Sequence, residues 1–299
     1  MTARAFLQLL LLAGIWGSSF MFMRIAVPAL GPGWTLEIRL LSAAAFIFLV
    51  TRFMREPLRL GQRWKHYLIL GLLNTAAPFF AFAWAAQALP ASILSILNAT
   101  APLWGVVVGV LWRRKPITPR AVLGLVCGIC GVAAIVGLGD IGIDRSALTY
   151  VGIALTASVC YAIASSYAEF AESVPAFANA HGSLWAAVLL VTPFLPLGAV
   201  PVDWPVPALL ASLVLGIVCS GLAYLLYYHL IATIGAASAM TVGYLIPLWG
   251  VFWGWLFLGE QVGWHTLAGA TLVLTGTALV TGLRLRSLLR RPAAEVSTG

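Results

Sequence analysis

The sequence predicts an all-α integral membrane protein with ten transmembrane helices in two inverted five-helix repeats, and with both termini in the cytoplasm. Three observations predict this fold class. The 299 residues are 62% hydrophobic and only 9% charged, with a mean hydropathy of +1.00, whereas a typical soluble domain is about 45–50% apolar and about 25% charged. The apolar residues form runs long enough to cross a bilayer, for which about 20 helical residues are needed. One pentapeptide, Pro-Leu-Trp-Gly-Val, occurs twice, at Pro102 and at Pro247.

Ten apolar stretches are separated by short breaks rich in proline and glycine, which are typical of turns. None of the breaks is long enough to hold a soluble domain. The first stretch carries Arg24 and lacks a clear small-residue cleavage site, so we expect it to remain as a helix rather than act as a signal peptide. The predicted spans are 5–27, 34–52, 67–88, 91–112, 119–138, 147–170, 177–198, 207–231, 236–257 and 264–283.

The basic residues predict the orientation of these spans. If the N-terminus is cytoplasmic, 14 of the 17 Lys and Arg residues fall on cytoplasmic segments, and only Arg145 lies outside. This is the positive-inside distribution of a multi-pass protein, here expected in a bacterial inner membrane. The net charge of +8 is divided among short loops instead of forming the single basic face that nucleic acid requires, so we expect no nucleic-acid partner.

The second pentapeptide lies 145 residues after the first, and the same shift aligns further residues. We therefore expect two copies of one unit, residues 1–145 and 146–299. Each copy has five spans, an odd number, so the second copy enters the membrane from the opposite side. Inverted repeats of this kind build many secondary transporters, with the substrate site near the midplane. The aligned pairs include Trp16 with Tyr161, Gly71 with Gly216, Gly109 with Gly254, Gly124 with Gly269, and Gly131 with Gly276.

Several motifs resemble those of the EamA-type exporters of the drug/metabolite transporter superfamily. They are Trp-Gly-Ser-Ser-Phe at 16–20, Arg39 in the second span, a proline in the fourth and ninth spans, and Leu-Gly-Glu at 258–260. Within that family the chain is most similar to the amino-acid exporters of the YddG kind. The resemblance covers nearly the whole chain and implies that the first, third, fourth, sixth, eighth and ninth helices surround a central cavity. The first repeat departs from the pattern, because it has Arg-Arg-Lys at 113–115 in place of Leu-Gly-Glu.

Polar and aromatic residues near the middle of the spans are the candidate substrate-binding residues, because a polar group at that depth is costly unless it faces protein or water. A helical proline also frees the carbonyl four residues earlier, which a membrane tolerates only where that carbonyl finds a donor or a wet cavity. The alternatives are that the aromatic residues only pack helices or form interfacial belts, and that the prolines only kink them. The twelve candidates are Trp16, Ser19, Asn74, Pro78, Asn98, Pro102, Tyr161, Ser165, Tyr224, Tyr227, Tyr244 and Pro247.

Few charged residues lie inside the spans. We expect Arg24 and Arg39 to sit near the outer ends, where arginine can snorkel to the interface; the alternative is that they bind substrate. Asp140, Asp144 or Glu260 could pair with either arginine. Glu169 and His229 could serve as gate or proton groups near the cytoplasmic ends, or could simply be solvated there.

Cofactor and metal chemistry is not predicted. Cys127 and Cys130 form a C-x-x-C pair without further ligands in an apolar span, which is more typical of buried small residues than of a metal site. The sequence lacks a Walker loop and the common hydrolase motifs. An intramembrane enzyme is a remote alternative, because mid-depth acid–base groups are missing.

These patterns predict a secondary exporter, not an enzyme, which moves amino acids or similar small metabolites by alternating access. Neutral and aromatic amino acids over a broad range fit the expected apolar cavity. A multidrug exporter of amphipathic or cationic compounds is the alternative. The expected partners are the small-molecule substrate and the lipid bilayer, and we expect a monomer.

Overall fold

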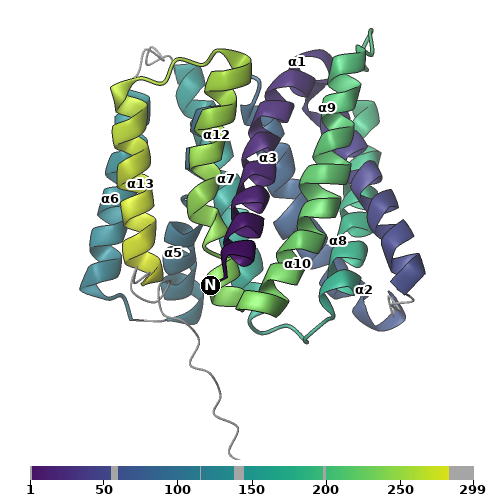
Figure 1. The fold of residues 1–299 in the computed structure, drawn as a ribbon, viewed down its shortest axis with the longest axis horizontal. Helices are drawn as coiled ribbons and strands as arrows, with labels where there is room; N and C mark the ends of the chain where they lie inside the picture. Colours follow the sequence, from purple (N-terminus) through teal and green to yellow (C-terminus); the bar gives the residue numbers. More distant parts are fainter. Residues whose placement is uncertain (1, 55–59, 115, 138–144, 198–199, 283–299) are drawn as a thin grey trace, which may run out of the picture.

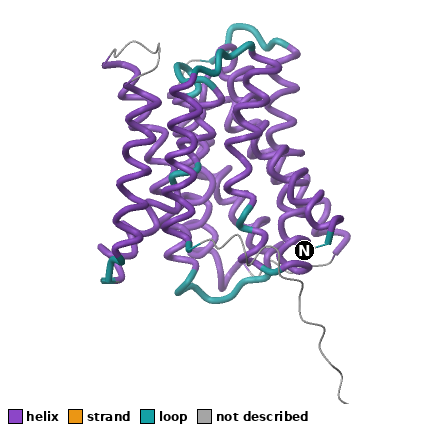
Figure 2. The backbone as a smooth tube through the Cα atoms, turned by 60° about the vertical axis from the view of Figure 1, so that its left-hand side comes forward, coloured by secondary structure: helices purple, strands orange, loops and turns teal. Residues whose placement is uncertain are grey.

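The computed structural model describes residues 2–54, 60–114, 116–137, 145–197 and 200–282, and these residues form a bundle of helices without strands (Figures 1 and 2). η1 and η3 are π-helices and η2 is a 3₁₀-helix. The elements are α1 (Ala3–Met54), α2 (Leu60–Leu70), η1 (Gly71–Ala76), α3 (Ala77–Ala85), α4 (Ala91–Asn98), α5 (Ala101–Arg113), α6 (Pro119–Gly137), α7 (Arg145–Ala168), α8 (Ala176–Val191), η2 (Thr192–Leu197), α9 (Val206–Gly216), η3 (Ile217–Leu222), α10 (Ala223–Ile234), α11 (Ala236–Ala239), α12 (Val242–Leu258) and α13 (Trp264–Thr281).

Many of these helices suit a bilayer. Among the described residues, seven helical segments are long and apolar enough to cross a membrane, and Val242–Leu258 is a shorter apolar helix. Large apolar side chains also cover the outside of the bundle, such as Leu111 at 78% and Trp264 at 68% exposure. An apolar exterior of this extent is unfavourable in water and favourable against lipid tails. The chain is therefore a multi-pass membrane protein.

The first two predicted spans both lie in α1, which consists of two helices that meet at Gly31. Gly31 interrupts α1 with a φ of 73°, a left-handed backbone conformation that glycine adopts without strain. Figure 1 shows α1 running from the N-terminus to the opposite end of the bundle, and the kink within α1 is at Gly31. We call this opposite end the Gly31 side and the other end, where Thr2 lies, the N-terminal side.

The two π-helices begin at or next to glycines that the 145-residue shift aligns. Gly71 opens η1, and a Cβ atom there would lie 2.8 Å from the carbonyl oxygen of Ser183 and 3.1 Å from the amide nitrogen of Ala187 on α8. Gly216 directly precedes η3, and a Cβ atom there would meet the carbonyl oxygen of Arg39 and, at 3.0 Å, the amide nitrogen of Ala43 on α1. Each glycine therefore lets its helix approach a helix of the other half of the chain. In both cases the glycine contacts a backbone carbonyl of that helix and the backbone amide four residues further along it.

Helices α6 and α13 lie side by side at one edge of the bundle (Figure 1). Their backbones meet at two glycine pairs: Cβ atoms added to Gly124 and Gly131 would lie 2.7 and 2.8 Å from the carbonyl oxygens of Gly276 and Gly269, respectively. Small residues permit this close approach between helices in a membrane. The shift aligns Gly124 with Gly269 and Gly131 with Gly276, but each glycine contacts the equivalent of the other: Gly124 meets Gly276 and Gly131 meets Gly269. A two-fold axis between the two helices would produce this crossed pattern.

Candidate functional site

A cavity of about 930 Å³ lies in the centre of the bundle. Residues of both halves of the chain line it, from α1 through to α13. Ten of the twelve candidate residues are in the lining, which places residues far apart in sequence around one space. They are Trp16, Ser19, Asn74, Asn98, Pro102, Tyr161, Ser165, Tyr224, Tyr227 and Tyr244.

Pro78 and Pro247 do not line the cavity, in contrast to the expectation for them. Both are buried, Pro78 in the first turn of α3 and Pro247 within α12. Their rings pack inside the protein, so these prolines can affect the cavity only through the backbone that they bend. Trp249, beside Pro247, also lies outside the lining, where its ring stacks on Trp253 at 5.4 Å.

An aromatic wall forms one part of the cavity. The ring centroids of Trp16 on α1 and Tyr227 on α10 are 5.2 Å apart, and Tyr228 lies 6.0 Å from Tyr227 and 6.2 Å from Tyr224. The successive turns of α10 place its three tyrosines close enough for tilted ring contacts, which add to the apolar contact area. Such a wall suits the apolar part of a small ligand.

Amide and hydroxyl groups supply the polar part of the lining. The side chains of Asn74 and Ser165 are exposed to the cavity, and Asn98 is partly exposed. Asn74 lies in η1, where the amide of Ala77 donates to the carbonyl of Leu72, five residues back. In a π-helix each N–H donates to the carbonyl five residues back and not four. The missing N–H of Pro78 therefore does not specifically leave the carbonyl of Asn74 without a donor. π-Turns are nevertheless frequent at functional sites.

The helix is broken before Pro102, and neighbouring carbonyls there have hydroxyl partners. Here α4 ends at Asn98 and α5 begins at Ala101. The carbonyl of Leu97 accepts hydrogen bonds from the hydroxyls of Thr100 (2.6 Å) and Ser158 (2.9 Å), and that of Ala99 accepts one from Thr277 (2.9 Å). Hydroxyls of α7 and α13 thus satisfy carbonyls that the break exposes.

Arg39 contradicts the expectation that it snorkels to the outer interface. Its side chain is only 5% exposed and lines the cavity. The sequence holds a signal that points to this position: an arginine within an apolar span, with no acid three or four residues away, is a functional candidate by default. Asn179, at the start of α8, is a further lining residue that the sequence analysis missed.

Arg24 and Glu260 each bind other groups and do not pair with each other. Arg24 donates from Nη1 to the carbonyl oxygen of Ala86 at 2.8 Å. Glu260 accepts from the amides of Ala91 (2.6 Å) and Ser92 (3.0 Å) and from the Ser92 hydroxyl (2.7 Å), so its carboxylate caps the N-terminus of α4. Asp140 and Asp144 lie outside the described residues.

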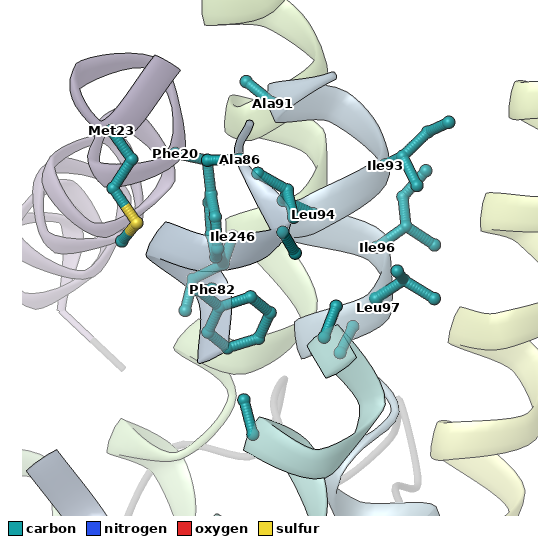
Figure 3. Packing of buried hydrophobic residues seen from close by; sticks show 14 of the residues in the cluster. Phe20, Met23, Phe82, Ala86, Ala91, Ile93, Leu94, Ile96, Leu97 and Ile246 are labelled. Carbon is teal, nitrogen blue, oxygen red and sulfur yellow. The ribbon is translucent and has the colours of Figure 1, made fainter. Parts of the chain in front are cut away.

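The cavity is closed toward the Gly31 side. Phe20 and Met23 of α1 and Phe82 of α3 end the lining there and are 2–5% exposed, with the two phenylalanine rings 5.4 Å apart (Figure 3). Beyond them Ala86 and Ala91 are fully buried in the same apolar cluster (Figure 3). These described side chains form an apolar layer at that end of the cavity.

The lining extends toward the N-terminal side. There it includes Asn179 near the start of α8, Met240 before α12, and Thr281 near the end of α13. Asn179 also accepts a hydrogen bond at Oδ1 from His66 Nε2 at 3.1 Å, and His66 Nδ1 contacts the hydroxyl of Tyr167 at 3.3 Å. The cavity therefore borders polar groups at this end and apolar packing at the other.

An apolar helical bundle around such a cavity defines a membrane transporter. The chain belongs to the EamA-like transporter family, whose model matches two stretches, residues 3–137 and 148–282. These stretches start 145 residues apart, the same shift that aligns the two pentapeptides. The resemblance of the sequence motifs to that family is thereby confirmed.

Several relatives match over most of their length. The chain is 26% identical to the uncharacterized transporter YoaV of Bacillus subtilis strain 168, over 88% of this chain and 91% of YoaV. It is 24% identical to the probable terminal-alkyne amino-acid exporter of Streptantibioticus cattleyicolor, over 98% and 97% of the two chains. It is 22% identical to protein PecM of Dickeya dadantii, over 91% of each. A solved crystal structure matches with a TM-score of 0.64 at 18% identity, over 94% of this chain and 99% of that one, which shows the fold alone.

Proposed function

We propose that the protein is a secondary exporter of amino acids and similar small metabolites, working by alternating access across a bacterial inner membrane. In this proposal ten spans form two inverted repeats, 1–145 and 146–299, with both termini in the cytoplasm. The crossed contacts of Gly124 with Gly276 and of Gly131 with Gly269 support the inversion, because they fit a two-fold axis. The single observation that carries the function is that ten candidate residues from both halves line one central cavity.

The shape of the cavity is compatible with loading of the substrate from the cytoplasm. The positive-inside distribution supports a cytoplasmic location of the N-terminal side. The cavity extends to that side and is closed on the Gly31 side by Phe20, Met23 and Phe82. The structure then represents a state that loads substrate from the cytoplasm. Export would require the Gly31 side to open, including the cap that Glu260 forms on α4.

The chemistry of the lining favours amino acids over cationic drugs. Among the described residues that line the cavity there is no Asp or Glu, so a lipophilic cation would have no countercharge. Aromatic rings such as Trp16 and Tyr227 can hold an apolar side chain, and Asn74 and Asn98 can hydrogen-bond polar groups. The name of the relative from Streptantibioticus cattleyicolor, an amino-acid exporter, supports the same class.

The test is counterflow in proteoliposomes that contain the purified full chain. Vesicles loaded with unlabelled phenylalanine, leucine or tryptophan should accumulate the corresponding labelled amino acid, and protein-free vesicles should not. Vesicles loaded with ethidium should show no accumulation of that dye. Accumulation of the dye without that of any amino acid would replace this proposal with the multidrug alternative.

A further inference from the structure

We infer that Arg39 is the anion-binding residue of the cavity, and that the ligands it selects carry a free carboxylate. This inference rests on the proposed function, because it takes the cavity to be the substrate site. It names the residue of this chain that would recognise the carboxylate of the substrate.

Arg39 is held in place on two sides. Its Nε donates to the hydroxyl of Ser220 in η3 at 3.1 Å. Its guanidinium carbon lies 3.6 Å from the centroid of the Phe79 ring of α3, a cation–π contact. A stacked guanidinium with one fixed hydrogen bond has few orientations left, so its remaining N–H groups point in defined directions.

One of those groups has no partner. Nη1 of Arg39 is buried and donates to no hydrogen-bond acceptor within the described residues. No carboxylate lies within ion-pair distance of Arg39 either, since the ion pair that the described residues form joins Arg63 and Glu172. Glu37, two residues before Arg39, binds the hydroxyl of Thr192 at 2.7 Å through Oε1 and lies outside the cavity lining.

A buried charge without a counterion is strongly unfavourable. Nη1 itself has almost no accessible surface, but Arg39 as a residue borders the cavity, so an anion drawn against its guanidinium can supply the missing counterion. The guanidinium fork matches a carboxylate, with which it can form two parallel hydrogen bonds. Arg39 is the sole Lys or Arg among the described lining residues, so one monoanionic carboxylate is better matched than a doubly charged phosphate.

The neighbours of Arg39 do not supply the missing negative charge. Cys219, Tyr161 and Tyr224 line the cavity as well, and none of them is a carboxylate. Together with the aromatic wall around Trp16 and Tyr227, they make a space with one positive group and apolar sides. An amino acid can place its carboxylate on Arg39 and its side chain on the wall.

Four probes that differ in the carboxylate test this role. L-phenylalanine and 3-phenylpropionate carry it, whereas L-phenylalaninamide and phenethylamine do not. Affinities would be measured by ligand-induced thermal stabilisation of the detergent-solubilised full chain. The two carboxylates should bind roughly 10- to 100-fold more tightly than the other two, since a charge-assisted pair is lost without the carboxylate.

Variants assign the preference to Arg39. The affinity ratios compared are those of L-phenylalanine to L-phenylalaninamide and of 3-phenylpropionate to phenethylamine. In Arg39→Gln both ratios should fall to about one, and Arg39→Lys should restore part of each. Arg24→Gln is the matched control, because Arg24 is also within α1 but lies outside the lining. It should keep the full ratio.

The outcomes separate the two proposals. Equal binding of all four probes by the unmodified protein, or a ratio unchanged in Arg39→Gln, would overturn the role of Arg39 and leave amino-acid export untouched. A carboxylate preference that Arg39→Gln removes would establish the anion site even if counterflow of amino acids failed, in which case only the proposed function would fall.

Discussion

Gly124 of α6 and Gly276 of α13 pack backbone to backbone: a Cβ atom on Gly276 would lie 2.5 Å from the carbonyl oxygen of Gly124. The reciprocal atom on Gly124 would lie 2.7 Å from the carbonyl oxygen of Gly276. No side chain fits between the helices at this point. The contact therefore joins the last helix of the first family match to the last helix of the second.

Replacing Gly276 by alanine should destabilise the protein by about 1–3 kcal/mol, because the new methyl group meets backbone atoms that cannot move aside. The measurement is the apparent Tm in detergent. Gly152→Ala on α7 is the control, since a Cβ atom there meets nothing within 4 Å. Similar Tm values for the two variants would show that α6 and α13 are not in the contact described.

The topology can be tested by cysteine labelling in intact cells, in a background without Cys127, Cys130, Cys160 and Cys219. A membrane-impermeant maleimide should label cysteines placed at 201–205 and at 140–145, the segments predicted outside. It should not label positions 59 or 116 unless the cells are opened. Labelling of Arg59→Cys in sealed cells would contradict the ten-span, positive-inside arrangement and the inversion with it.

Transport should continue without a proton gradient. Among the described residues that line the cavity there is no Asp, Glu or His that could carry a proton through it. We expect counterflow at equal pH on both sides to be unchanged by a protonophore. If flux instead required the gradient, and Glu169→Gln or His229→Ala removed that requirement, proton coupling through these residues would replace this expectation.

The sequence predicted the residues of the cavity better than the details of its backbone. Depth along a span and the 145-residue shift were sufficient to bring Trp16, Tyr161 and Asn98 to one cavity, because both depend only on helix length and repeat alignment. The π-turns at Gly71 and Ile217 could not be predicted in this way, since they depend on how closely another helix approaches.

Long side chains were the other source of error. Arg39 lies only a few residues from the expected start of its span, yet contacts with Phe79 and Ser220 hold its guanidinium in the protein interior. Glu260 was expected to pair with an arginine, but the open amides of Ala91 and Ser92 at the start of α4 hold its carboxylate. In both cases the tertiary partner decides where the charge lies.

The most direct test of the central claim is flux per inserted protein for variants of the cavity. Trp16→Ala, Tyr161→Ala and Asn98→Ala should each reduce counterflow of phenylalanine at least several-fold, because the aromatic and amide groups that contact the substrate are removed. Trp264→Ala is the matched control, since Trp264 is 68% exposed and lies outside the lining; it should retain the flux of the unmodified protein. Equal losses in all four variants, or no loss in the first three, would contradict the claim that this cavity is the transport site.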